Sequence, residues 1–344
     1  MYYRRVPDTT LSLSEIGFGC GGNAGLMVRG SLADQQRVVA RALELGINYF
    51  DTAPDYGDGA AEANLGRVLR ALGQQPVINS KVEIREGDLA DIAGHVVASC
   101  EGSLKRLGID HLDCLQIHNG PVAAAPELQG GSYRQLALQD FLRAGGVLEG
   151  FHRLRAAGKI GHAGFVCRGG DGNEVRELLK TGQFQLINVP YTLINPTAGL
   201  ARPPANRALP DYGGVINDAG RSGVGCAVFS PLAGGALTDD RLNGAAGHPL
   251  ARSYDPNAEP ARQTIEMAKA VRFLAQDSHM SLAQAAYRFI LMHEHVTTVV
   301  GGFSSQEQVE EIASVSGMGP FMADSMVKLE AVWHGRAGSP LARG

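Results

Sequence analysis

Helical patterns and short apolar runs follow one another along this chain. Four times a helical pattern ends in glycine and a β-branched or apolar run follows at once, in the segments 42–53, 104–118, 154–167 and 220–232. Glycine is common just past a helix end because that position often needs a positive φ angle. Each run that follows has the length of an ordinary strand, about five or six residues. These segments therefore predict four helix-to-strand junctions.

Further strands are predicted where short apolar runs occupy 15–19, 77–82, 186–191 and 296–300. Helical patterns lie between the strands. One of them has the i, i+3, i+4, i+7 spacing of an amphipathic helix, at Leu65, Val68, Leu69 and Leu72. Strands that alternate with helices predict right-handed βαβ units and a parallel sheet. Eight such units in 344 residues predict an α/β fold, a closed (β/α)8 TIM barrel rather than an open sheet.

Three stretches interrupt this alternation, at 119–146, 195–212 and 238–260. Each follows a predicted strand, so in a barrel each lies on the C-terminal face, where substrate sites are built. We therefore expect a single barrel domain over residues 1–344 with elaborated loops on that face. Residues 320–344 are expected to form a C-terminal helix and tail.

The competing architecture is a doubly wound dinucleotide-binding fold. Its first strand is followed by a glycine-rich turn that opens a helix, with an acidic residue about 20 residues further on. The glycine cluster at 17–22 is a weak signal for such a turn. The regular alternation of strands and helices therefore favours the barrel.

Composition narrows the class of protein. With 44% apolar and 19% charged residues the chain can bury a large core, and disorder is not expected. The net charge of −4 comes without a long basic run, which argues against nucleic-acid binding. No apolar stretch approaches the ~18 residues of a transmembrane helix, and no secretory signal is visible at the start, so we expect no membrane association.

The cysteines and histidines suggest neither disulfides nor a metal site. Three adjacent residues, His293, Glu294 and His295, cannot converge from one face of a helix or strand, so no metal is predicted there. The five cysteines lack CxxC spacing, and most lie in apolar segments. We therefore expect a cytoplasmic protein whose cysteines are small buried side chains. They are Cys20, Cys100, Cys114, Cys167 and Cys226.

Polar side chains gather at the ends of three successive predicted strands. Asp51 closes the first, Lys81 lies near the end of the second and His118 closes the third, while Tyr56 follows Asp51 by five residues. Side chains alternate along a strand, and neighbouring parallel strands lie about 4.8 Å apart, so these groups can meet on one face. Each residue alone fits an ordinary structural role, such as a helix cap or a core histidine. Their joint placement favours a catalytic site.

A tyrosine beside a lysine and an aspartate has a clear chemical use. Free tyrosine has a pKa of about 10, and a nearby ammonium group favours the phenolate and lowers that pKa. Asp51 would hold Lys81 charged and in place. Tyr56 can then donate a proton to a carbonyl oxygen while a hydride reaches the carbonyl carbon, or accept one in reverse. His118 would complete an oxyanion-type pocket.

The segment 46–69 resembles the first signature of the aldo-keto reductase family, and the runs 77–82 and 113–118 resemble its later strand-end motifs. The resemblance extends from about residue 11 to residue 317. It implies a barrel that binds NADP(H), or alternatively NAD(H), in an extended pose without a Rossmann fingerprint. It also implies an NAD(P)-dependent oxidoreductase whose catalytic tetrad is Asp51, Tyr56, Lys81 and His118.

The same resemblance implies cofactor contacts. Phe229 would stack on the nicotinamide, since stacking needs a flat ring of about its size. The loop after it would wrap the pyrophosphate, and the segment after the last strand would hold the adenosine, with serine hydroxyls and backbone N–H groups at a helix start as an anion site. The implied contacts are Val166, Cys167, Asn188, Phe229, Ser230, Leu232, Gly234, Gly235, Gly302, Ser304, Ser305, Gln308 and Glu311.

Several of these positions depart from the family pattern. Val166 and Cys167 stand where the family has a Ser-Asn pair that holds the carboxamide, and Asn188 replaces the usual Gln. Ile312 replaces the Asn that usually ends the adenosine helix. The clamp on the carboxamide is therefore expected to be weakened.

A 2′-phosphate normally requires a cation. No Lys or Arg lies in 301–312, so that cation would come from Arg241, Arg252 or Arg262. NADP is the expected cofactor, and NAD stays open.

The leading hypothesis is reversible carbonyl reduction and alcohol oxidation. One alternative keeps the barrel and tetrad for proton transfer, as an epimerase or lyase with bound or absent nicotinamide. Another is a non-catalytic regulatory subunit that binds nicotinamide. The family's frequent Trp after the catalytic His is Asn119 here, which favours a sugar-like or hydroxy-ketone substrate over an aromatic one. Substrate identity and oligomeric state stay open.

Overall fold

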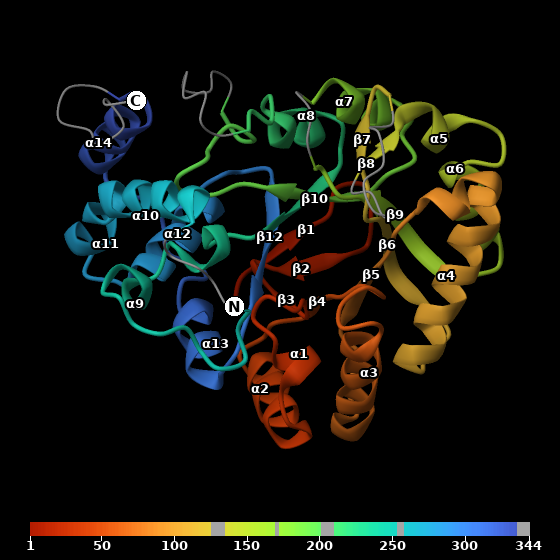
Figure 1. Cartoon of the computed structure of the whole chain (residues 1–344), viewed down its shortest axis with the longest axis horizontal. Helices are drawn as coiled ribbons and strands as arrows, with labels where there is room; N and C mark the ends of the chain where they lie inside the picture. Colours follow the sequence, from red (N-terminus) through yellow and green to blue (C-terminus); the bar gives the residue numbers. More distant parts are fainter. Residues whose placement is uncertain (125–134, 169–171, 201–209, 253–257, 336–344) are drawn as a thin grey trace.

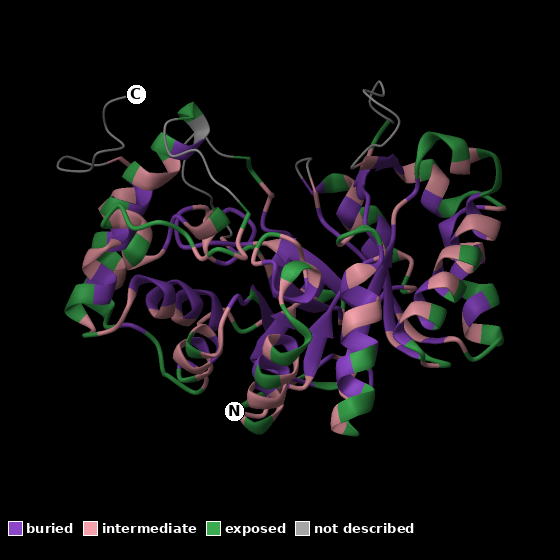
Figure 2. Cartoon of the chain, turned by 60° about the horizontal axis from the view of Figure 1, so that its bottom comes forward, coloured by how far each residue is buried: buried purple, intermediate pink, exposed green. Residues whose placement is uncertain are grey.

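The structure, a computed structural model, describes residues 1–344 except 125–134, 169–171, 201–209, 253–257 and 336–344. Strands occupy the middle of the molecule and helices surround them (Figure 1). The buried residues concentrate in the strands and on the inner faces of the helices (Figure 2). The three interruptions of the strand–helix alternation and the C-terminal tail lie partly outside the described residues.

Eight parallel strands form the central sheet, in the spatial order β10, β11, β12, β3, β4, β5, β6, β9. A parallel bridge between Val166 and Asn188, and a 2.8 Å hydrogen bond from the Cys167 N–H to the Asn188 carbonyl, join the two ends of this sheet. The sheet is thus the closed barrel of a (β/α)8 fold. Its strands are β3 (Ile16–Gly19), β4 (Tyr49–Asp51), β5 (Val77–Val82), β6 (Leu112–Ile117), β9 (Ile160–Phe165), β10 (Leu186–Pro190), β11 (Gly225–Phe229) and β12 (Val296–Gly302).

The predicted TIM barrel is confirmed. The four strands predicted at 15–19, 77–82, 186–191 and 296–300 agree with observed strands to within two residues at each end, and each of the four predicted junctions leads into an observed strand. The segment 77–82 is observed with the predicted bounds, as β5. The glycine cluster at 17–22 belongs to the barrel too, although its spacing fits GxGxxG. Gly17 and Gly19 lie inside β3, and a Cβ on Gly17 would stand 2.9 Å from the Tyr49 ring. Glycine there makes room for a tyrosine inside the barrel.

Helices alternate with the strands around the barrel. Glycines end several of them in the left-handed conformation, as Gly73 does after α3 and Gly108 after α4. At the four helix-to-strand junctions that the sequence predicted, Gly46, Gly108, Gly158 and Gly223 all have positive φ angles. The helices between strands are α1 (Leu26–Arg29), α2 (Leu32–Glu44), α3 (Ala60–Leu72), α4 (Ile92–Leu107), α6 (Val147–Ala156), α7 (Asn173–Lys180), α8 (Val215–Arg221) and α12 (Leu282–Leu291), and α13 (Gln306–Ala313) follows the last strand.

The barrel closes tightly between β9 and β10. A Cβ on Gly164 would lie 1.8 Å from the Leu186 carbonyl oxygen and 2.9 Å from Gln116 Cγ. Only glycine therefore lets β9 approach β10 closely enough at this point. The same strand continues into Val166, Cys167 and Arg168, so this closure also positions the segment at the barrel mouth.

An N-terminal hairpin lies under the barrel, and the sequence did not predict it. The antiparallel strands β1 (Tyr3–Arg5) and β2 (Ser12–Ser14) pair with each other. Val6 and Leu13 are fully buried in one apolar cluster with Tyr49, Cys114, Leu186, Ala227 and Val300 from the barrel strands. The hairpin therefore closes the end of the barrel opposite the predicted site.

The stretches that interrupt the alternation carry secondary structure of their own. The first contains the paired strands β7 (Gly120–Val122) and β8 (Gln135–Ala137) and the helix α5 (Leu138–Leu142). The link from β11 to α12 contains α9 (Asp239–Leu242), α10 (Glu259–Val271) and α11 (Phe273–Asp277), and short 3-10 helices are found at Glu86–Asp91 and Ala233–Gly235.

A last helix, α14 (Ala323–Trp333), packs beside the barrel, with the Trp333 indole N–H donating to the Leu193 carbonyl at 2.9 Å.

The five cysteines are free and buried, as expected from their apolar surroundings. Within the part of the chain that the structure describes, no helix is long and apolar enough to cross a membrane.

Candidate functional site

A buried ion pair stands at the C-terminal end of the barrel interior. Lys81 on β5 binds the Asp51 carboxylate at the end of β4, and the two side chains are only 2% and 5% exposed. The Lys81 ammonium also donates to the Thr52 carbonyl at 2.8 Å. Such a pair is costly to desolvate, so its burial indicates that the charges serve a purpose other than stability.

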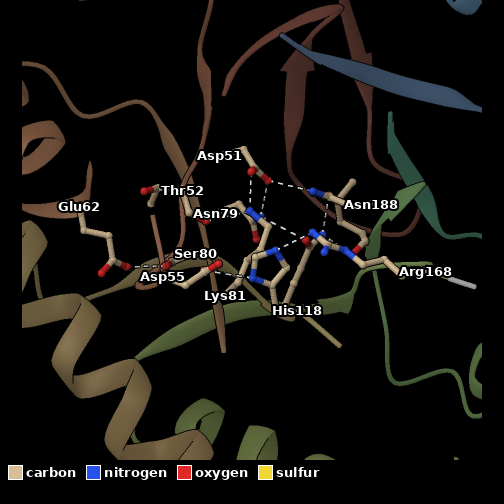
Figure 3. A network of polar contacts seen from close by, with 12 residues as sticks. Asp51, Thr52, Asp55, Glu62, Asn79, Ser80, Lys81, His118, Arg168 and Asn188 are labelled. Carbon is tan, nitrogen blue, oxygen red and sulfur yellow. Dashed lines mark hydrogen bonds and ion pairs between the residues drawn. The ribbon is translucent and has the colours of Figure 1, made fainter. Parts of the chain in front are cut away.

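Amide side chains hold the second oxygen of Asp51. Asn79 donates to Asp51 Oδ2 at 2.8 Å, and Asn188 donates to it at 3.0 Å. Gln116 links the two amides, since it donates to Asn188 Oδ1 at 2.9 Å and accepts from Asn79 at 3.3 Å. Asp51 and these three amides thus form one hydrogen-bonded layer inside the barrel. Figure 3 shows Asp51, Asn79 and Asn188 of this layer. This layer fixes Asp51, which in turn fixes Lys81.

Tyr56 lies on the loop between β4 and α3 and faces the ion pair. Lys81 Nζ is 5.1 Å from the centroid of the Tyr56 ring. The ring stands edge-on to His118, with centroids 5.8 Å apart and an interplanar angle of 79°. The structure therefore brings together all four residues, Asp51, Tyr56, Lys81 and His118, that the strand-end pattern singled out.

Burial and charge oppose each other at Tyr56. Burial raises the pKa of the Tyr56 phenol and outweighs the opposing effect of Lys81, so the pKa lies above its usual value. The effect of Lys81 on Tyr56 has the direction that the sequence predicts, but the lowered pKa expected for Tyr56 is wrong because burial dominates. Burial also acts to lower the pKa of Lys81, but Asp51, Tyr56 and Asp55 together more than offset it and the pKa is raised. Tyr56 is therefore a protonated donor beside a permanent cation.

His118 lies between two charged side chains. Its Nδ1 is 3.1 Å from Asp55 Oδ1, and its Nε2 is 3.0 Å from Arg168 Nη2. Burial lowers the pKa of His118, and Lys81 and Arg168 act in the same direction. Burial acts to raise the pKa of Asp55, but the hydrogen bond with His118 and the charge of Lys81 together hold that pKa below its usual value. The pair is thus a neutral imidazole beside a carboxylate.

Asp55 and Arg168 are the site residues that sequence reasoning missed. Asp55 immediately precedes Tyr56, and Arg168 immediately follows the Val166–Cys167 pair. Both lie outside the regular strands, so strand alternation gave no direction for their side chains. The sequence contained one indication of these two site residues, namely that each is a charged residue directly next to a predicted site residue.

The positions expected to hold the nicotinamide carboxamide are occupied with other contacts. Both polar ends of Asn188 are used inside the barrel, by Asp51 and Gln116. Cys167 is 3% exposed and packs in the hydrophobic core. Val166 is 1% exposed and has no polar side-chain atom. None of these three side chains offers a free amide or hydroxyl group.

Phe229, the aromatic predicted to stack on the nicotinamide, and the loop that follows it are accessible from the barrel mouth. Phe229 ends β11 and is half-buried, with the Arg168 guanidinium 5.9 Å from its ring centroid. Ser230, Gly234 and Gly235 have positive φ angles. A Cβ added to Gly234 or Gly235 would meet nothing within 4 Å. This loop with half-buried Leu232 leaves backbone free for close approach, as a pyrophosphate requires.

The predicted adenosine segment begins at the end of β12 and runs into α13. Ser305 caps the helix by accepting from the Gln308 N–H, and the Ser304 hydroxyl donates to the Ala24 carbonyl at 2.7 Å. Gly302 is exposed beside Ala24, and Glu311 is half-buried on α13. Ile312 is buried in the core.

Among the three arginines considered for a 2′-phosphate, Arg252 lies beside this segment. Its N–H donates to the Asn23 carbonyl at 2.7 Å, and the next residue, Ala24, accepts from Ser304. Arg262 pairs with Glu259 on its own helix instead.

The arrangement is a (β/α)8 barrel with a proton donor, a buried cation and an open loop at its C-terminal mouth. Comparison with known proteins identifies its family. Residues 15–334 match the aldo/keto reductase family, to which this chain belongs.

Two curated relatives from Escherichia coli cover nearly the whole chain. L-glyceraldehyde 3-phosphate reductase of strain O157:H7 is 27% identical over 96% of this chain and 92% of its own. The NADH-specific methylglyoxal reductase of strain K12 is 25% identical over 95% and 98%. Among solved structures, the glycerol dehydrogenase of Gluconobacter oxydans matches 98% of this chain and 97% of its own with a TM-score of 0.72 at 19% identity, which supports the fold. This chain is an oxidoreductase that interconverts carbonyl and alcohol groups with a nicotinamide cofactor.

Proposed function

We propose that this protein is an NADPH-dependent reductase of small polar carbonyl compounds, with Tyr56 as proton donor, supported by the charged pair Asp51 and Lys81 and by the neutral His118. The observation that carries the proposal is the buried Asp51–Lys81 ion pair directed at the Tyr56 ring, 5.1 Å from Nζ to the centroid. An oxidoreductase of this family needs a proton donor beside the carbonyl oxygen, and Tyr56 is the phenol whose ring lies against Lys81. The reverse reaction uses the same groups.

The bound cofactor supplies a hydride to the carbonyl carbon. Tyr56 transfers its phenolic proton to the carbonyl oxygen as the negative charge develops there, so a carbonyl becomes an alcohol and a phenolate is left. The Lys81 ammonium stabilises that phenolate, and Asp51 keeps Lys81 in position. A tyrosine whose pKa is raised by burial starts the reaction fully protonated, which favours the direction of reduction.

The cofactor fits the site in part. Phe229 and the open glycines 234 and 235 suit the nicotinamide ring and the pyrophosphate. Val166, Cys167 and Asn188 do not suit the carboxamide, because their side chains are apolar, buried or already hydrogen-bonded. The adenosine side, from Gly302 to Glu311, would then carry most of the binding.

Arg252 supports the preference for NADPH over NADH, since its backbone is tied to the loop that contacts Ser304. Arg252→Met should weaken NADPH binding about tenfold or more, the worth of one hydrogen bond to a charged group, and leave NADH binding nearly unchanged. Fluorescence titration with both dinucleotides measures this. Arg262→Met is the matched control. Equal losses for the two dinucleotides, or wild-type binding of NADH alone, would overturn the NADPH assignment.

The decisive test of the reaction is Tyr56→Phe. Carbonyl reduction should fall by at least about 100-fold, the lower end for general acid catalysis, while NADPH still binds. Tyr191→Phe is the control, because Tyr191 is a buried tyrosine that packs against Phe289, with ring centroids 5.2 Å apart, rather than against Lys81. If the Tyr56→Phe variant turns over at the wild-type rate, Tyr56 is not the proton donor.

A further inference from the structure

The protons on His118 follow from its two neighbours. A guanidinium group has only N–H donors, so Arg168 Nη2 must donate across the 3.0 Å contact to His118 Nε2. Nε2 then carries a lone pair, and the ring proton sits on Nδ1. From there it is donated to the Asp55 carboxylate across 3.1 Å. Figure 3 shows His118 between Asp55 and Arg168.

This arrangement has a consequence for the carbonyl site. A histidine whose Nε2 accepts a hydrogen bond cannot use that nitrogen to donate to a carbonyl oxygen. The group that donates to His118 Nε2 is the Arg168 guanidinium. Arg168, and not His118, therefore supplies the hydrogen-bond donor expected beside Tyr56.

Arg168 has donors to spare. Its Nε is buried and has no hydrogen-bond partner among the described residues, and no described carboxylate forms an ion pair with it. Its guanidinium lies 5.9 Å from the centroid of Phe229, so the side chain extends over the barrel mouth from beyond the end of β9 towards the end of β11. A guanidinium presents its N–H groups in a planar fork, which binds two neighbouring oxygens better than one.

We propose that Arg168, positioned by the Asp55–His118 pair, binds the substrate and selects carbonyl compounds with a second oxygen on the neighbouring carbon, such as α-hydroxy aldehydes and α-hydroxy ketones. This inference rests on the proposed carbonyl reduction. The fork takes the carbonyl oxygen with one N–H and the neighbouring oxygen with another. Asp55 and His118 are positioning residues, since they act through Arg168.

Two pairs of substrates of equal size test the selection. Glycolaldehyde is compared with propanal, and hydroxyacetone with butanone, so that only a hydroxyl replaces a methyl group. The wild type should prefer the hydroxylated member in kcat/KM by about 10-fold or more, the worth of a hydrogen bond to a charged group. Arg168→Met should remove most of this preference, and Arg168→Lys, which keeps the charge but not the fork, should restore only part of it.

A second measurement needs no cofactor. NMR of ¹⁵N-labelled histidine reports the tautomer and pKa of His118, which is faced by Asp55, Tyr56, Lys81 and Arg168. The proton should reside on Nδ1 in the wild type. Asp55→Asn should lower the pKa of His118 because it removes a carboxylate, and Arg168→Met should raise it because it removes a cation. Asp58→Asn is the control, since it makes the same change on the same loop at a position (φ 53°) that Asn tolerates.

The outcomes separate the two proposals. A preference unchanged in Arg168→Met, or a proton on Nε2, overturns the role of Arg168 even if carbonyl reduction is intact. A wild type that reduces none of the four compounds, nor any other carbonyl compound, overturns the proposed function, and the NMR result still decides the Asp55–His118–Arg168 chain.

Discussion

Single side chains at the barrel mouth act through their neighbours. Asp51, Lys81 and His118 meet because they end successive strands of a parallel sheet, and strand alternation was enough to predict that meeting. Asp55 and Arg168 were not predicted, because each lies beyond a regular element, where φ and ψ rather than periodicity decide the direction of a side chain. The pKa of Tyr56 could not be predicted either, because it depends on how completely the ring is buried.

Lys81→Met should act on Tyr56 through charge. Lys81 opposes the burial that raises the pKa of Tyr56, so removing it should raise that pKa further. Alcohol oxidation, which needs the phenolate, should then move to higher pH in a profile of kcat/KM against pH. The single change leaves the Asp51 carboxylate buried without its partner. The double variant Lys81→Met with Asp51→Asn is therefore measured beside it, because it has no uncompensated buried charge. An unshifted profile in both variants would mean that Lys81 does not influence Tyr56.

Cys167→Asn tests the clamp position in the core. The family pattern suggested that an amide here, together with Val166→Ser, would tighten cofactor binding. The thiol is buried in the hydrophobic core, so an amide at this position should instead cost about 1–3 kcal/mol of unfolding free energy as an unpaired polar group. Urea unfolding and NADPH titration of the two single variants measure both effects. Tighter binding by Cys167→Asn without a loss of stability would show that residue 167 can turn towards the cofactor.

At the scale of elements, the strands of the barrel were predictable and the parts added to it were not. A buried parallel strand is a short run rich in β-branched and apolar residues between two helical patterns, which is why the barrel strands could be found. β5 was found with its observed bounds although Asn79, Ser80 and Lys81 within it are polar. The hairpin strands β1 and β2 have three residues each, too few for a period to be visible. The hairpin contributes to the hydrophobic core through one or two side chains, above all Leu13, which is fully buried beneath the barrel.

Leu13→Ala should therefore destabilise the protein although it lies at the opposite end from the site. A buried leucine truncated to alanine typically costs about 2–5 kcal/mol, depending on how far the cavity collapses. Leu32→Ala, at a position that is 40% exposed on α2, is the control and should cost much less. Chemical unfolding of both variants checks the expectation. Equal stability of the two would show that the hairpin does not contribute to the core.

At the scale of the whole molecule, hydrogen bonds and an ion pair link the N-terminal segment that precedes β3 to the residues around β12. Arg4 donates to the carbonyls of Leu291, His293 and Val296, at 2.6, 3.1 and 2.7 Å. It also pairs with Glu15 at 2.8 Å, whose other oxygen accepts from Ser316 and Gly317. The first strand of the barrel, β3, pairs with the last, β12, so these contacts lock the seam of the closed sheet.

Arg4→Met should lower the stability of the entire barrel. It removes the donor to three carbonyls and leaves Glu15, whose side chain is 9% exposed, without its cation, so we expect a loss of at least about 2 kcal/mol. Arg5→Met is the control, because Arg5 contacts only Thr9 within the hairpin in the described structure. Unfolding followed by circular dichroism and by loss of activity should show one transition for both signals, shifted in the Arg4 variant alone.

The seam between the first and last strands also has a meaning for how this protein is made. A ribosome delivers the chain from its amino end, and Arg4 emerges 292 residues before the partner carbonyl of Val296. The nascent chain therefore cannot seal its barrel until β12 has been synthesised, and until then β3 has one hydrogen-bonding edge unpaired. An exposed strand edge is a site for pairing with other chains. During translation, this protein should thus depend on factors that shield its earliest strand until its latest one arrives.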